Sequence, residues 1–115
     1  MIFEEMVSLL EMVRAARVEL VDETGDATHR GKKLLHQAED YASELPPRVM
    51  EHPSALQTVT TVRTELGTCL LAADQLADAG VADALVTHVL RRGAGLAERA
   101  LVLAVLSPEM AAATS

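Results

Sequence analysis

The segment SALQTVTTVRTELGTCLLAADQLADA, from Ser54 to Ala79, decides the fold because both ends of a helix and its buried face can be read from it. Ser54 and Gln57 have the spacing of an N-terminal capping box, and Gly80 stands where a left-handed residue would end the helix. Its apolar residues recur every three or four positions, on one side of a helix: Leu56, Val59, Val62, Leu66, Leu70, Ala73 and Leu76. We therefore predict a long amphipathic helix against which the rest of the chain packs.

Three further segments have helical periodicity: residues 3–21, 27–45 and 81–106. In the last of these, Gly93-Ala94-Gly95 predicts a kink or a split, or the close approach of another backbone. The connections are short, so consecutive helices are expected to be antiparallel. The sequence therefore predicts an all-α, four-helix up-down-up-down bundle formed by residues 1–107, followed by a frayed tail of residues 108–115.

The charges at the start of the second predicted helix oppose the helix dipole, because Arg30, Lys32 and Lys33 lie near its positive end. If the first two helices form a hairpin, the acids at its tip compensate these bases. Those acids are Glu19, Asp22, Glu23 and Asp26, and we also expect Asp26 to be the N-cap of the second helix.

Composition restricts the partners and the compartment. A net charge of −7 argues against a nucleic-acid partner, which requires clustered bases. The longest apolar run, residues 100–106, is far shorter than the roughly 20 residues that cross a membrane. The acidic N-terminus is unlike a secretory signal, and a single cysteine, Cys69, forms no internal disulfide. We expect a soluble cytoplasmic protein with no membrane partner and a buried Cys69.

No catalytic motif is present: the sequence has no glycine-rich phosphate loop, G-x-S-x-G elbow or H-E-x-x-H. His29, Lys33, His36 and Asp40 share the helix face opposite the apolar stripe, which predicts exposure to solvent. Two turns of helix separate His29 from His36 by roughly 10 Å, too far for one metal ion. We therefore expect neither catalysis nor a metal or cofactor site.

The first and fourth predicted helices are neighbours in such a bundle, and both carry apolar residues far around their circumference. Because soluble proteins rarely leave a large apolar patch bare, we expect a partner to cover it. A twofold homodimer through these helices is the simplest closed assembly, and an accessory or regulatory role in a larger bacterial-type system is the other form. The interaction residues predicted here are Phe3, Met6, Val7, Leu10, Leu101 and Val105.

An alternative function starts from His29-Arg30-Gly31-Lys32. This run resembles the histidine phosphotransfer domain, a four-helix bundle of similar length in which a lysine follows the exposed histidine by three residues. Lys32 keeps that spacing, whereas Lys33 stands where the family has glycine. The resemblance implies that His29 accepts a phosphoryl group, and Arg30 and Lys33 are bases suited to hold it.

A second basic set lies along the border of the apolar face of the fourth helix. His88, Arg92 and Arg99 are spaced by four and seven residues, with Gly95 between the arginines. One interpretation pairs these bases with acids of the first helix, such as Glu4, Glu5 or Glu11. The other places an anionic ligand or an acidic partner segment over Gly95.

Overall fold

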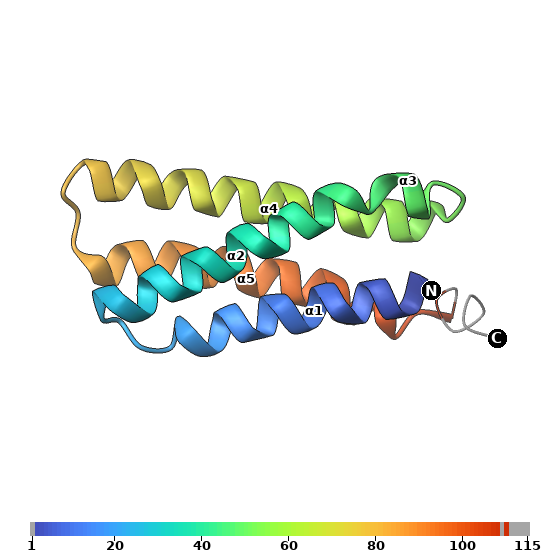
Figure 1. Ribbon diagram of the computed structural model, residues 1–115, viewed down its shortest axis with the longest axis horizontal. Coiled ribbons are helices and arrows are strands. Elements are labelled where there is room, and N and C mark those ends of the chain that lie inside the picture. Colours follow the sequence, from blue (N-terminus) through green and yellow to red (C-terminus); the bar gives the residue numbers. More distant parts are fainter. Residues whose placement is uncertain (1, 109, 111–115) are drawn as a thin grey trace.

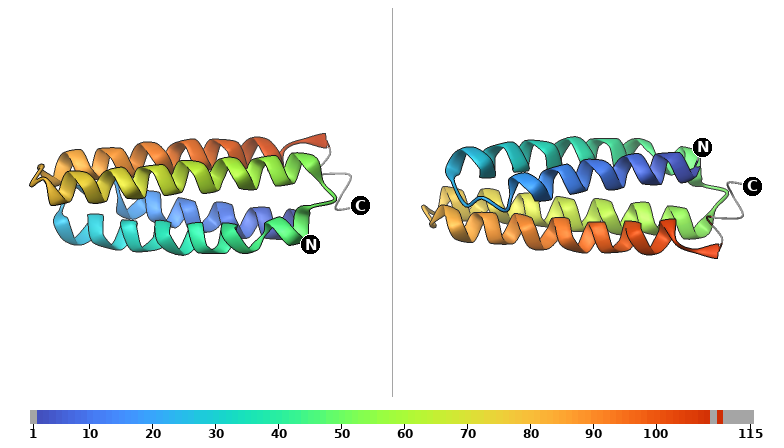
Figure 2. Two further views of the ribbon diagram at one scale, coloured as in Figure 1. Left: turned by 90° about the horizontal axis from the view of Figure 1, so that it is seen from above. Right: turned by 90° about the horizontal axis from the view of Figure 1, so that it is seen from below.

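The described part of the chain, residues 2–108 and 110 of this computed structural model, is almost entirely helical. Five helices follow one another: α1 (Ile2–Glu19), α2 (Gly25–Glu44), α3 (Pro46–Val49), α4 (Pro53–Asp78) and α5 (Asp83–Val105). The four long helices lie side by side and alternate in direction along a body of 49 × 21 × 17 Å (Figures 1 and 2). The predicted all-helical bundle is confirmed, with the one-turn helix α3 as an addition to the four predicted helices.

The end of α4 has the chemistry that its sequence predicts. Gly80 adopts a φ of 75°, a left-handed conformation that glycine tolerates best. Its N–H donates to the carbonyl of Ala77, and the N–H of Val81 donates to the carbonyl of Leu76, each at 3.0 Å. These two bonds form a Schellman motif, which satisfies carbonyls that the helix leaves without partners.

Two predicted N-caps are wrong by two residues. The N-cap of α2 is Thr24, whose hydroxyl accepts from the N–H of Ala27 at 3.3 Å, so Asp26 lies inside the helix. The N-cap of α4 is His52, because Pro53 already occupies the first turn. Proline suits that position because its ring fixes a helical φ and it has no N–H to leave unpaired.

The predicted kink or split at Gly93-Ala94-Gly95 is also wrong, since α5 is one continuous helix. A Cβ added to Gly93 would overlap Cβ and Sγ of Cys69 on α4 and lie 3.2 Å from the carbonyl of Glu65. Gly93 therefore serves the close approach of α4 and α5, the other role predicted for this glycine segment.

One apolar core runs the length of the bundle, and the predicted stripes supply most of it. The stripe of α4 is buried at Val59, Val62, Leu66, Leu70 and Ala73. Of the predicted tail, Met110 is buried and its N–H donates to the hydroxyl of Ser107 at 3.2 Å. Residues 109 and 111–115 lie outside the described residues.

A pair of buried hydroxyls connects α2 to α5. The hydroxyl oxygens of Thr28 and Thr87 are 2.5 Å apart, and Thr87 also donates to the carbonyl of Asp83 at 2.8 Å. Since Thr87 has one proton, Thr28 must be the donor between the two threonines. The chain of donors satisfies both buried hydroxyls.

The hairpin tip between α1 and α2 holds only part of the predicted charge pairing. Nε of Arg30 donates to Glu19 at 2.9 Å, and this bond raises the pKa of Arg30. Lys32 instead pairs with Asp74 of α4. The bases of α2 are therefore compensated by two neighbouring helices rather than by the tip alone.

Candidate interaction surface

The six residues predicted to form an outer patch lie mostly between helices. Met6 and Leu101 are fully buried and Leu10 nearly so, while the other three, Phe3, Val7 and Val105, are half-buried. The physical reason is that α1 packs against α2 on one side and α5 on the other, so its wide apolar stripe covers two neighbours. These residues do not form the exposed patch expected for a homodimer through α1 and α5.

Exposed leucines gather instead on α5. Leu85 and Leu103 are 18 residues apart, about five turns at 3.6 residues per turn, so they lie on one line along the helix. Leu96 falls within about 20° of that line, and Leu106 follows the last turn. The four side chains are between 43% and 76% exposed. Together they form an apolar row about 27 Å long from Leu85 to Leu103, at 1.5 Å per residue.

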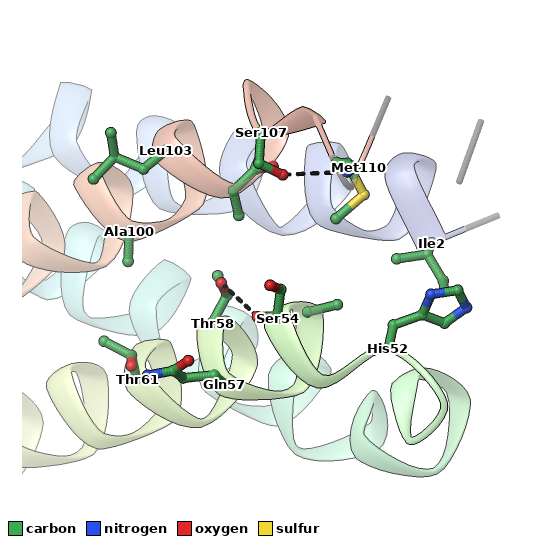
Figure 3. Close-up of a pocket in the computed structure, with 12 residues that line it drawn as sticks. Ile2, His52, Ser54, Gln57, Thr58, Thr61, Ala100, Leu103, Ser107 and Met110 are labelled. Carbon is green, nitrogen blue, oxygen red and sulfur yellow. Dashed lines mark hydrogen bonds between the residues drawn. The ribbon is translucent and has the colours of Figure 1, made fainter. Parts of the chain in front are cut away.

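Two hollows lie between α4 and α5 beside this row, and Figure 2 shows these two helices side by side. The hollow nearer the chain termini has a volume of about 350 Å³ and includes Leu103 (Figure 3). The other has a volume of about 220 Å³ and includes Leu96. On the α4 side both are lined mainly by small or hydroxyl-bearing residues: Ser54, Ala55, Thr58, Thr61, Thr68 and Ala72.

We call this outward surface the α4–α5 face. It comprises the two hollows and the following exposed residues of α5 and its C-cap: Leu85, His88, Arg92, Leu96, Arg99, Leu103 and Leu106. Small side chains on α4 leave room for another helix to approach closely, while the leucines of α5 offer apolar side chains for it to pack against. The face therefore combines two hollows with a row of exposed apolar side chains.

The three bases of this face have no ion-pair partner among the described residues, so the predicted pairs of His88, Arg92 and Arg99 with acids of α1 are wrong. The edge of α5 that faces α1 carries Arg91 and Glu98 instead. Arg91 contacts Glu23 at 3.1 Å, and Glu98 accepts from Arg17 at 2.7 Å. Helical spacing alone did not indicate which edge of α5 faces α1.

Cys69 borders the smaller hollow but is 5% exposed, as predicted. Burial raises the pKa of its thiol to about 11, and the charges of Glu39 and Glu65 act in the same direction. The thiolate is the nucleophilic form, so this cysteine is unsuited to nucleophilic catalysis near neutral pH.

The predicted phosphoryl site lies on a different surface. His29, Arg30 and Lys33 are exposed on α2, and Arg30 is held by Glu19. Gly31, the small residue of the motif, is buried: a Cβ there would lie 2.6 Å from the side chain of Leu20. Gly31 therefore serves the packing of α2 on α1, and the exposed His29 and Lys33 remain for the phosphotransfer alternative.

Across residues 2–108 and 110, no three or more His, Cys, Asp or Glu side chains are grouped so as to hold a metal ion. None of the helices within that range is both long and apolar enough to cross a membrane. No protein-family model matches the chain, and neither the curated proteins nor the solved structures include a significant match. The fold and the α4–α5 face are therefore the basis for a functional proposal.

Proposed function

We propose that this chain is a non-enzymatic helical-bundle protein that acts by binding another protein through its α4–α5 face. The observation that carries the proposal is the row of exposed leucines on α5. Single exposed leucines are ordinary, whereas several in one row beside hollows are typical of interaction sites.

The opposite side of the bundle provides an internal comparison. Apart from Gly25, the exposed positions of α2 are polar: Asp26, His29, Arg30, Lys33, His36, Gln37, Asp40, Ser43 and Glu44. A helix face that only meets water is expected to have this composition. The leucines of α5 therefore distinguish its outer side from that of α2, although Val18, Val21, Met50 and Leu71 are also exposed elsewhere on the chain.

Self-association is the less favoured form of the proposal. A twofold axis across the α4–α5 face near Leu96 would place Arg92 of one copy close to Arg99 of the other. Among the described residues, only Glu65 contributes an acid to the two hollows, so the arginines of the two copies would meet with little compensation. A different protein, with the chain as its accessory subunit, avoids this repulsion.

The test replaces Leu96 and Leu103 together with Glu, and compares this variant with Val18→Glu plus Val21→Glu. The control valines are each 73% exposed and lie in the last turn of α1 and in the turn that follows it, so both variants add two acids at exposed apolar positions. Tagged proteins are expressed in the native cells, cross-linked and measured for stoichiometric partners. We expect the complex to be lost only in the leucine variant, with both variants retaining their helical circular dichroism. A complex that survives in the leucine variant would refute the proposal.

A further inference from the structure

We infer that the partner of the α4–α5 face is an amphipathic helix with acidic residues along one edge, which lies in the groove over α5. This inference rests on the proposed function and adds the chemistry of the partner. It starts from the spacing of four exposed residues, Arg92, Leu96, Arg99 and Leu103, which follow one another at steps of four, three and four.

That spacing is a heptad pattern facing away from the core of this chain. Residues seven apart return to the same side of a helix after about two turns, and such patterns pair helices in coiled coils. Apolar positions pack against the partner while charged positions beside them select its acids or bases. An outward heptad with leucines and arginines therefore fits a helical partner that offers leucines and carboxylates.

The charge of the partner follows from the bases that remain unpaired. Arg14, Arg17, Arg30 and Arg91 each contact an acid within the described residues, as do Lys32 and Arg48. Arg92 and Arg99 do not, and neither do the exposed Lys33 and Arg63, which lie outside the α4–α5 face. The chain as a whole has a net charge of −7. The α4–α5 face is thus a basic strip on an acidic protein, and it attracts acidic surfaces while it repels basic ones.

The spacing also favours a helix over a small anion. Seven residues separate Arg92 from Arg99 along a helix, about 10.5 Å at 1.5 Å per residue, so one carboxylate or phosphate contacts both only if the two long side chains bend toward each other over Gly95 and Leu96. Two acids that are themselves seven residues apart on a partner helix match that distance. The leucine row of about 27 Å corresponds to a partner helix of about 18 residues.

The edges of the partner differ in chemistry. Its acidic edge lies above the arginines on the outer side of α5, and its other edge lies over the hydroxyl-rich row of α4, which includes Thr58, Thr61 and Thr68. The acids are therefore expected on one edge only, with small or neutral polar residues on the other.

The experiment uses two labelled 21-residue helical peptides that share one leucine heptad and differ only in carrying Glu or Lys along one edge. Binding is measured by fluorescence anisotropy at 50 mM and 300 mM salt, below the concentration at which either peptide self-associates. We expect the full-length protein to bind the Glu peptide at least ten times more tightly than the Lys peptide at low salt. The preference shrinks at high salt because the charges are exposed.

Two charge variants provide matched controls. Arg92→Glu plus Arg99→Glu should reverse the preference, so that the Lys peptide binds more tightly. Lys33→Glu plus Arg63→Glu makes the same change in net charge at exposed bases outside the face, so it should keep the original order. Leu96→Ser plus Leu103→Ser should weaken binding of both peptides.

Equal affinity for the two peptides would overturn the acidic partner and leave the proposed interaction function intact. If neither peptide binds while the Leu96→Glu and Leu103→Glu variant still loses its cellular complex, the acidic helical partner is also overturned and the proposed interaction function stands. If sedimentation shows a dimer that these leucine changes convert to a monomer, the occupant is a second copy and the inference is wrong. If the cellular complex survives both in the Leu96→Glu and Leu103→Glu variant and in the Val18→Glu and Val21→Glu control, the proposed function itself is refuted.

Discussion

The close approach of α4 and α5 at Gly93 predicts a large effect from adding one methyl group. In Gly93→Ala the new Cβ would overlap the Cys69 side chain, so α4 and α5 must separate or bend. Overpacking of this kind costs about 3 kcal/mol, at the upper end of its usual range. Alanine also stabilises a helix interior by about 1 kcal/mol relative to glycine. The net loss in the free energy of unfolding should therefore be about 2 kcal/mol.

Gly95 supplies the matched control in the same helix. A Cβ at this position has no other side chain or neighbouring backbone within 4 Å, so Gly95→Ala keeps only the gain in helix propensity. It should stabilise the protein by about 0.5 to 1 kcal/mol. Urea unfolding of both variants should thus give free energies that differ by about 3 kcal/mol.

A double-mutant cycle identifies the contact responsible. Cys69→Gly removes both atoms that the new methyl would meet on that residue, so Gly93→Ala should cost much less in this background. Cys69→Ala should relieve less of the cost, since its Cβ remains. Equal effects of alanine at Gly93 and Gly95, or no coupling to Cys69→Gly, would refute the close-packing argument.

The remaining predictions concern buried groups and the alternative function. Thr87→Val should destabilise by about 1 to 3 kcal/mol, because it leaves the buried Thr28 hydroxyl without an acceptor. In urea unfolding, the double variant Thr28→Val plus Thr87→Val should lose less stability than the sum of the losses in the two single variants. Additive losses would contradict the pairing. Because folding raises the pKa of Cys69 from 9.0 to about 11, its contribution to stability is complete below pH 9 and is lost as pH rises towards 11. The urea midpoint of unfolding should fall between pH 9 and pH 11 in the wild type and not in Cys69→Ala. Identical pH profiles of the two proteins would contradict the raised pKa of Cys69. A small-molecule phosphodonor should add no acid-labile phosphoryl group by intact mass, and a gain that disappears in His29→Gln would favour the phosphotransfer alternative.

The buried face of each long helix was predictable because it depends on local periodicity. Val59, Val62 and Leu66 recur at helical spacing, and all three are fully buried. The left-handed cap at Gly80 was equally local. The N-cap of α4 was missed because Pro53 and Ser54 are both suited to starting a helix, and proline has the earlier position.

The surface was less predictable, because it depends on which helices become neighbours. The wide stripe of α1 suggested an exposed patch, but Met6 and Leu10 pack against neighbouring helices. Gly93 could have marked a kink or a contact, and only the position of Cys69 on the adjacent helix distinguishes the two. The spacing of His88, Arg92 and Arg99 was visible in the sequence, but a spacing does not reveal which edge of α5 faces α1, and the exposed Leu96 and Leu103 beside these bases were not singled out.

The three edges of α5 differ in what they contact, and this difference supports the proposed function. One edge packs closely on α4 through Gly93, and a second is tied to α1 through Glu98 and to the α1–α2 connection through Arg91. Both edges therefore have partners whose chemistry matches them. The third edge repeats the apolar composition of a packed surface at Leu96 and Leu103 and has unpaired bases beside it. If water alone met this edge, its composition should resemble the polar outer face of α2. It resembles the contact edges instead, which is why a helix from another protein is the occupant that best fits it.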